Sequence, residues 1–210
     1  MKAFLFDLDG TLLLSDEEIF YDNYFKLVSS EFLEFDPKEF ISAINEIIKE
    51  MTFEDDLRNN YHKFMEKMGL RFRKDPFEFE KRFTDFYTGK FKLLKSLTLP
   101  NHELIEQMRK LDGIKVLATN PLFPEIAIKE RMKWAGLREE EFDLITFMEN
   151  SHYLKPNPKY FLEIASKIKV DPVECTMIGN DPILDGACQK IGMKFVLIGD
   201  EDGYKNRIKS

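Results

Sequence analysis

Two carboxylates stand two residues apart where the first apolar segment of the chain ends, in the stretch KAFLFDLDGTLLL at residues 2–14. Residues 2–6 have the near-continuous hydrophobicity of a strand that is covered on both faces. Because a strand directs side chains i and i+2 to the same side, Asp7 and Asp9 would crowd together, and each would raise the cost of ionising the other. A metal ion or a cationic ligand would relieve this repulsion, and Gly10 permits the sharp turn that a close approach to a ligand needs.

Further polar side chains follow the later apolar segments, and they are Thr119, Asn120, Lys155, Asp181 and Asp185. Asp181 and Asp185 lie four residues apart at the start of a predicted helix, so they would share one side of it. If all these segments end at one edge of a sheet, four carboxylates face a single ammonium group in one cleft. This excess of negative charge and the hard carboxylate oxygens favour Mg²⁺ as the bound cation.

The elements that must position these side chains alternate between helix and strand from residue 97 onward. Predicted helices lie at 101–111, 124–135, 158–168 and 182–191, and predicted strands lie at 115–118, 142–147, 175–178 and 194–198. Such alternation implies crossover connections and a parallel sheet with helices on both faces. The predicted fold class is therefore α/β, with a Rossmann-like parallel sheet as its core.

Residues 15–96 carry helix signals and no convincing strand. Ser15 with Glu18 forms a capping-box pattern ahead of a helix to about residue 35. Asp36-Pro37 and Asp75-Pro76 give an N-cap and a first-turn proline for two more helices. A further helix is predicted at 54–68, closed by Gly69, and Gly89 ends the last one.

This helical segment holds thirteen of the twenty phenylalanines, which is the dense apolar content that a small helical unit needs for a core of its own. The predicted organisation is a core formed by residues 1–14 and 97–210, interrupted by an all-helical cap at 15–96. An insertion that leaves the chain directly after Asp9 would overhang the carboxyl edge of the sheet, where ligands bind in open α/β folds.

Composition limits the partners and the compartment. The net charge of −7 and the isoelectric point near 5.2 argue against nucleic acid or an anionic membrane as a main partner, because both reward a basic surface. No stretch approaches the ~20 apolar residues of a membrane span or the pattern of a signal peptide, so we expect a cytoplasmic protein. Cys175 and Cys188 lie among apolar or small residues, which indicates reduced core thiols rather than a disulfide or a metal pair.

Four short motifs resemble, in the same order, those of the haloacid dehalogenase superfamily of phosphotransferases. They are DLDGT at 7–11, the apolar strand that ends in Thr119, the lysine of KPNP at 155–158, and the acidic IGNDPILD at 178–185. The helical insert resembles the cap of that superfamily's first subclass, so the resemblance covers the whole chain. It implies a Mg²⁺-dependent phosphatase that hydrolyses a small phosphomonoester through an aspartyl-phosphate intermediate.

The resemblance also implies catalytic roles. Asp7 would be the nucleophile that attacks phosphorus, a role that carboxylates can fill. Asp9 would protonate the leaving oxygen and then activate water. Lys155 would neutralise charge on the nucleophile and on the phosphoryl group.

Binding roles follow in the same way. Thr119, with the backbone N–H groups of Leu8 and Asn120, would hold the phosphoryl oxygens. The metal ligands would be Asp7, the Asp9 carbonyl, Asp181 and Asp185. The fourth motif departs from its commonest form, because Asn180 stands directly after the glycine and Asp181 follows. We assign the direct metal contact to Asp181 and leave open whether Asn180 takes that position.

Simpler structural roles stand beside these. Thr119 could cap the following helix, Asp181 could cap a helix that starts near Pro182, and Lys155 could be a solvated loop charge. His152, close to Lys155, is more typical of an exposed loop histidine than of an acid–base group.

Two other functions stay open at this stage. A phosphomutase that acts on a sugar phosphate uses the same aspartyl-phosphate, and a non-catalytic binding or regulatory protein can share the fold. Asp9 argues against a dehalogenase, in which no leaving alkoxide needs a proton. The polar run from Arg58 to His62, with Asn59, Asn60 and Tyr61 between them, is a candidate substrate-facing set or simply an exposed helix surface. The sequence names neither the phosphorylated metabolite nor the oligomeric state.

Overall fold

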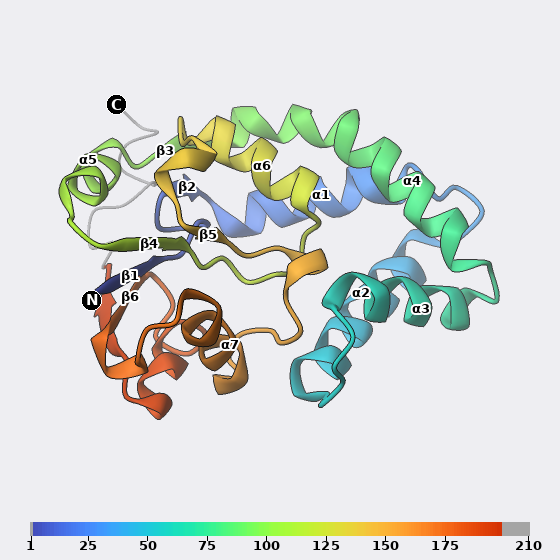
Figure 1. Ribbon diagram of the computed structural model, residues 1–210. Coiled ribbons are helices and arrows are strands. Elements are labelled where there is room, and N and C mark those ends of the chain that lie inside the picture. The colour runs from blue at the N-terminus through green and yellow to red at the C-terminus, as the bar shows by residue number, and fades with distance from the viewer. Residues whose placement is uncertain (1, 199–210) are drawn as a thin grey trace.

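The opening apolar segment is the central strand of a five-stranded parallel sheet in the computed structural model, which describes residues 2–198 (Figure 1). The strands are β1 (Ala3–Phe6), β4 (Ile114–Leu117), β5 (Leu144–Ile145), β6 (Cys175–Gly179) and β7 (Lys194–Leu197). Their order is β5-β4-β1-β6-β7, and every neighbouring pair is parallel. The predicted α/β class is confirmed, and all five strands end at one edge.

Helices cover both faces of this sheet (Figure 1). Helices α5 (His102–Lys110) and α6 (Glu125–Trp134) lie on one face, and α7 (Pro158–Ile168) lies on the other with the 3₁₀ segment Gly186–Ile191. Adjacent residues of β1 supply the two apolar cores, since Phe6 packs in the first and Leu5 in the second. This is the alternation expected of a strand that is buried on both sides.

The helical insertion comprises α1 (Glu17–Ser29), α2 (Pro37–Phe53), α3 (Asn60–Phe72), α4 (Pro76–Thr88) and a 3₁₀ segment, Lys90–Leu97. It lies between two short strands, β2 (Leu13–Ser15) and β3 (Thr98–Pro100), which pair antiparallel at the base of the insertion. The helix starts predicted after Asp36 and Asp75 are confirmed, because both carboxylates accept backbone N–H groups of the first turn. Gly89 ends α4 as predicted.

Several helix boundaries in the insertion were wrong. Helix α1 ends at Ser29 rather than near residue 35, because turns follow it. Ser15 does not cap α1, because it is the last residue of β2 and pairs with Thr98; Asp16 is the cap and accepts a hydrogen bond from the Ile19 N–H at 3.2 Å. Helix α3 begins six residues later than predicted, after Asn59, and it runs through Gly69 to Phe72.

The predicted helix at 182–191 is a tight turn followed by the 3₁₀ segment Gly186–Ile191. The Asp181 carboxylate accepts the N–H groups of Ile183 and Leu184 at 2.7 and 2.8 Å, and its carbonyl accepts the N–H of Asp185 at 3.0 Å. These are the bonds of a helix N-cap, so Asp181 caps a single turn, which passes into the 3₁₀ segment at Gly186.

The phenylalanines of the insertion form a packed aromatic core, as predicted. Phe32, Phe40 and Phe83 have ring centroids 4.5 to 6.5 Å apart, and all three are buried. This core continues onto the sheet domain, because the ring of Phe91 stacks on that of Trp134 at 5.1 Å. The boundaries of the cap at 15 and 96 stay a prediction.

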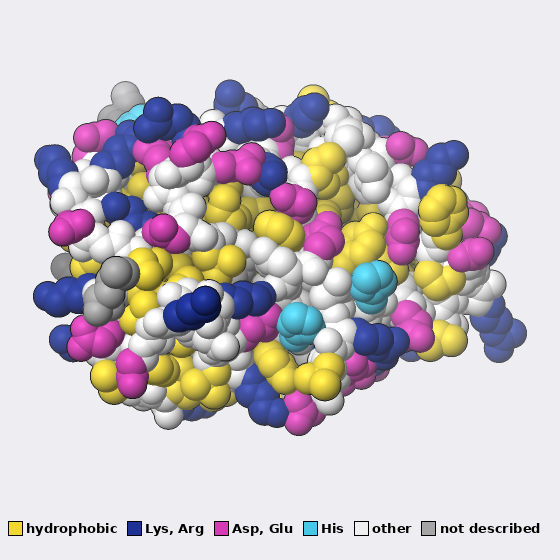
Figure 2. Space-filling model, viewed as in Figure 1, with side chains coloured by type: hydrophobic (Ala, Val, Ile, Leu, Met, Phe, Trp, Pro, Cys, Tyr) yellow, Lys and Arg dark blue, Asp and Glu magenta, His cyan; other side chains and the backbone are white. Residues whose placement is uncertain are grey.

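The surface and the thiols agree with the composition. Acidic and basic side chains are interspersed over the face shown in Figure 2. Within residues 2–198, no helix is long and apolar enough to cross a membrane. Cys175 and Cys188 are both buried free thiols, as predicted.

Candidate active site

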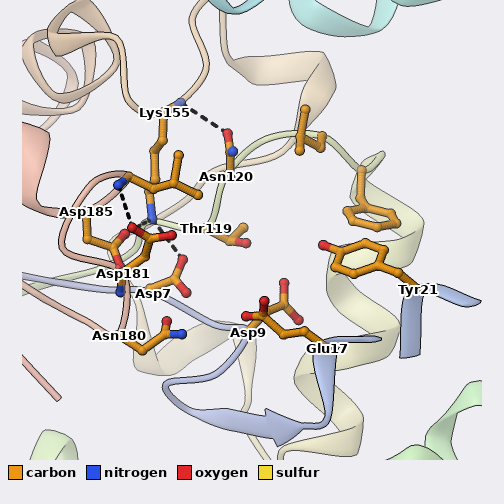
Figure 3. Close-up of a pocket in the computed structure, with 13 residues that line it drawn as sticks. Asp7, Asp9, Glu17, Tyr21, Thr119, Asn120, Lys155, Asn180, Asp181 and Asp185 are labelled. Carbon is orange, nitrogen blue, oxygen red and sulfur yellow. Dashed lines mark hydrogen bonds and ion pairs between the residues drawn. The ribbon is translucent and has the colours of Figure 1, made fainter. Parts of the chain in front are cut away.

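A cavity of about 220 Å³ opens at the carboxyl edge of the sheet (Figure 3). The structure brings all the predicted side chains together there, since the lining includes Asp7, Asp9, Thr119, Asn120, Lys155, Asp181 and Asp185. Each comes from the end of a strand or from the loop that follows one. Sequence spacing predicted this convergence correctly because the carboxyl ends of parallel strands share one edge.

Lys155 lies at the centre of the site, between two of its carboxylates. Its ammonium group lies 2.8 Å from the Asp7 Oδ1 and 2.5 Å from the Asp185 Oδ1, and its side chain is buried (Figure 3). Burial alone would lower the pKa of Lys155, but the two carboxylates outweigh burial and raise it. The backbone N–H of Lys155 donates to the Asn120 side chain at 3.1 Å, which fixes the loop. Lys155 is therefore a buried cation, and the alternative of a solvated loop charge is wrong.

Asp7 lies in an environment that resists its ionisation. Burial raises the pKa of Asp7 to about 7; the carboxylates of Asp185 and Asp9 also raise it, while Lys155 opposes them. One ammonium group thus does not balance the acids of this cleft. A further positive charge would stabilise the ionised form of Asp7.

The donor set fits a hard divalent cation, although no group of three ligating side chains in the described part of the chain is arranged as a ready-made metal site. Lys155 lies between Asp7 and Asp185, and the Asp181 carboxylate is turned toward its own loop. Mg²⁺ keeps several waters and needs only one or two carboxylates, so Asp7 with Asp181 or Asp185 suffices chemically. Gly179 makes room for this arrangement, because a Cβ there would lie 2.1 Å from the Asp185 Oδ2.

Unused hydrogen-bond donors lie on Thr119 and Asn120, which line the same cavity, and on Leu8, which stands between the lining residues Asp7 and Asp9. The Thr119 hydroxyl and the backbone N–H groups of Leu8 and Asn120 donate to no other residue between 2 and 198. Thr119 is held in place through its carbonyl, which accepts hydrogen bonds from Thr146 and Tyr160 at 2.9 and 2.8 Å. It does not cap a helix, because α6 begins after Pro124. Three free donors around one cavity suit an anion with several oxygens.

A residue that sequence reasoning missed contacts Asp9. The guanidinium of Arg131, on α6, lies 2.5 Å from the Asp9 Oδ2 and 4.1 Å from the centre of the Phe123 ring. Arg131 is fully buried, whereas the Asp9 side chain is 32% exposed. Asp9 lines the cavity and Arg131 does not, so Arg131 contacts the Asp9 carboxylate from outside the cavity.

Comparison with known proteins assigns the family of this site. The family model of haloacid dehalogenase-like hydrolases matches residues 1–185. The chain belongs to this family. A search of curated proteins found no match.

Solved haloacid dehalogenase family structures share the whole fold. An enzyme of this family from Bacteroides thetaiotaomicron has a TM-score of 0.61 at 18% identity, with 100% of this chain and 99% of that chain covered. The same enzyme crystallised with magnesium and inorganic phosphate has a TM-score of 0.55 at 16% identity, with 99% and 98% covered. A haloacid dehalogenase phosphatase from Thermococcus onnurineus has a TM-score of 0.58 at 21% identity, with 97% and 90% covered.

Asn180, the departure in the fourth motif of this haloacid dehalogenase-like hydrolase, packs against the turn that follows Asp9. Its Oδ1 accepts the Thr11 hydroxyl at 3.1 Å. A Cβ on Gly10, which has a φ of +73°, would lie 2.3 Å from the Asn180 Nδ2. The amide thus fits closely over a glycine that must also adopt a left-handed backbone conformation.

The insertion contributes different residues to the cavity than predicted. Glu17 and Tyr21 of α1 line it, whereas no residue of the run 58–62 does. Arg58 pairs with Asp56 and Glu66 on the surface, and Asn60 is buried where α3 meets the loop before Lys155. The interpretation of residues 58–62 as substrate-facing was wrong.

His152 lies outside the cavity. Its ring Nδ1 is 2.7 Å from the Glu163 carboxylate, and its backbone N–H donates to the same carboxylate at 3.0 Å. These bonds give His152 a structural role in the loop that carries Lys155.

Proposed function

We propose that this hydrolase is a Mg²⁺-dependent phosphatase that releases inorganic phosphate from a small phosphomonoester. The observation that carries the proposal is the arrangement around Lys155, in which a buried ammonium group lies beside the Asp7 carboxylate and the unused donors of Thr119 and Asn120 belong to residues that line the same cavity. A phosphoryl group placed there would have the nucleophile on one side and hydrogen-bond donors around its oxygens. Relatives crystallised with magnesium and phosphate support the same reading.

In the first step, a carboxylate oxygen of Asp7 attacks phosphorus, and the bond between phosphorus and the leaving oxygen breaks. Asp9 gives its proton to that oxygen, so the alcohol departs neutral. Lys155 and the N–H groups of Leu8 and Asn120 stabilise the charge that builds on the phosphoryl oxygens. The product of this step is an aspartyl-phosphate on Asp7 and a free alcohol.

In the second step, Asp9 takes a proton from a water molecule as the water oxygen attacks phosphorus. The bond between phosphorus and the Asp7 oxygen breaks, which releases inorganic phosphate, restores the Asp7 carboxylate and leaves Asp9 protonated for the next cycle. Arg131 keeps the Asp9 carboxylate in place for both transfers. Asp7, the Asp9 carbonyl, Asp181 and Asp185 would hold Mg²⁺, which supplies positive charge for the phosphoryl oxygens when bound.

The insertion would restrict access to the cavity and exclude water during the reaction. We propose residues 15–96 as this cap. The partner is then a small phosphorylated metabolite rather than nucleic acid or a membrane, in agreement with the acidic composition.

The test is phosphate release from a panel of phosphomonoesters with Mg²⁺ and with a chelator. Asp7→Asn should lose release on every ester, whereas Asp22→Asn, on the exposed side of α1, should behave like the wild type. No release from any ester by the wild type would overturn the proposal. Conversion of a sugar phosphate to its isomer without net phosphate release would instead identify a phosphomutase.

A further inference from the structure

Five carboxylates and one ammonium group line the cavity. Glu17 adds to Asp7, Asp9, Asp181 and Asp185, and Lys155 is the single cationic side chain in the described lining. Lys155 is already shared between two of those acids. Arg131 does not line the cavity, and its one hydrogen bond to a carboxylate goes to Asp9.

Glu17 lies where the alcohol half of a phosphomonoester would lie. It is the first residue of α1, and Figure 3 places its carboxylate beside that of Asp9, on the side away from Lys155. A leaving oxygen that receives a proton from Asp9 therefore points its substituent toward Glu17. This step rests on the proposed function.

No basic side chain of residues 2–198 forms an ion pair with Glu17. Partial burial raises the pKa of Glu17, the carboxylates of Asp9 and Asp181 raise it further, and a hydrogen bond from the neutral Asn180 side chain opposes them only in part. A positively charged group on the substrate would offset this unbalanced charge, whereas a second anionic group would add to it.

The neighbouring wall suits the same ligand. Tyr21 follows Glu17 by one helical turn, and its ring lies with Leu122 and Phe123 along the cavity. An aromatic ring face next to a carboxylate is a favourable binding site for an ammonium group, because the ring quadrupole and the negative charge both attract the cation.

We propose that the alcohol half of the substrate carries a positive charge and no second anion, and that Glu17 is the residue that selects it. Substrates of the phosphoglycolate or sugar bisphosphate kind are disfavoured, because no free cation among the lining residues within 2–198 receives their other anionic group. The proposed class is the phosphomonoesters of amino alcohols.

Three esters of equal size test this selection. Ethanolamine phosphate, ethylene glycol phosphate and phosphoglycolate differ at the far end of a two-carbon alcohol, which is cationic, neutral or anionic. We expect kcat/KM to fall in that order, with the cationic ester favoured over the anionic one by about tenfold or more. Glu17→Gln should reduce this preference by about tenfold, and Glu17→Lys should reverse it.

Glu18→Gln is the matched control. It removes the same charge from the same helical turn, and Glu18 is exposed as Glu17 is but does not line the cavity, so the order of the three esters should stay that of the wild type. Equal or better turnover of phosphoglycolate than of ethanolamine phosphate would overturn the inference, as would a preference unchanged in both Glu17 variants. Turnover of p-nitrophenyl phosphate without turnover of ethanolamine phosphate would overturn it while leaving the phosphatase proposal standing. No turnover of any ester would refute the phosphatase proposal itself.

Discussion

Replacing Arg131 with methionine should separate catalysis from stability. Arg131 is fully buried, and one of its N–H groups contacts Asp9, while its Nε and Nη2 have no hydrogen-bond partner within the described residues. Methionine is long, apolar and flexible enough to fill the space and to keep contact with the Phe123 ring. The variant therefore removes the charge and leaves most of the packing.

Opposing contributions set the size of the change in stability. Breaking a fully buried ion pair costs about 3–5 kcal/mol, but Asp9 is 32% exposed and regains water, so the cost here is smaller. The contact with the Phe123 ring is worth about 1–2 kcal/mol. Each unpartnered buried nitrogen donor costs about 1–3 kcal/mol, and the variant removes that penalty at both Nε and Nη2. We expect the free energy of unfolding to stay within about 2 kcal/mol of the wild type.

In contrast to stability, catalytic activity should fall strongly in Arg131→Met, and the size of the fall should depend on the leaving group. Proton transfer by a positioned side chain contributes about 10²–10⁴-fold, and an Asp9 that is no longer held loses part of this. We expect kcat/KM on an alkyl phosphate to drop by about 10–100-fold, with a smaller drop on p-nitrophenyl phosphate, whose leaving group needs no proton.

The assay compares kcat/KM on both esters with urea denaturation of the same preparations, because kcat/KM reports only the steps up to formation of the aspartyl-phosphate. Arg138→Met is the control, because Arg138 is exposed and its pair with Glu141 at 3.6 Å lies on the surface. Wild-type kcat/KM on both esters in Arg131→Met would refute the positioning role. An equal loss of kcat/KM on both esters would also refute it, because protonation of the leaving oxygen by Asp9 would then not be the step affected.

Three further predictions concern the cavity and its support. The raised pKa of Asp7 means that the contribution of this carboxyl to the free energy of unfolding is fully present below about pH 4 and is lost as the pH rises through about 7. In metal-free urea titrations, the free energy of unfolding of the wild type should therefore fall by on the order of 4 kcal/mol over this range relative to that of Asp7→Asn. Mg²⁺ should restore part of this loss at pH 7. Gly179→Ala should lower kcat/KM by about 100-fold, because its Cβ would displace the Asp185 carboxylate, whereas Gly186→Ala should not, since the nearest atom to its Cβ is 3.5 Å away. Asn60→Ala removes a buried amide that donates a hydrogen bond from the insertion to the loop before Lys155, so the free energy of unfolding measured by chemical denaturation should fall by about 1–2 kcal/mol. An unchanged free energy of unfolding in this variant would contradict a stabilising role for that hydrogen bond.

The parts of the site that lie at strand ends could be predicted from the sequence. Asp7, Lys155 and Asp185 are far apart in the chain, yet each follows an apolar segment whose neighbours alternate with helices. Because parallel strands end at one edge, the alternation alone places their polar residues together. The fold class followed from the same pattern.

The residues that depend on helix packing could not be predicted. Arg131 reaches Asp9 only because α6 lies against the insertion and against β2 and β3 at its base. Its one sequence signal is an arginine between Ile128 and Ala135 on the apolar side of a predicted helix. Glu17 was missed because β2 is only three residues long, too short for a strand pattern, so that Ser15 was interpreted as the helix cap.

The central claim is that Asp7 carries the phosphoryl group, and trapping that group tests it most directly. Asp9→Asn should slow attack by water while still allowing Asp7 to react with p-nitrophenyl phosphate, so the intermediate should accumulate with Mg²⁺. Acid quench, trypsin digestion and mass spectrometry should find one phosphoryl group on the peptide of residues 3–26, labile to hydroxylamine and absent when Asp7→Asn is added. Phosphate release without any such label on that peptide, or a label that persists in the Asp7→Asn variant, would contradict the account.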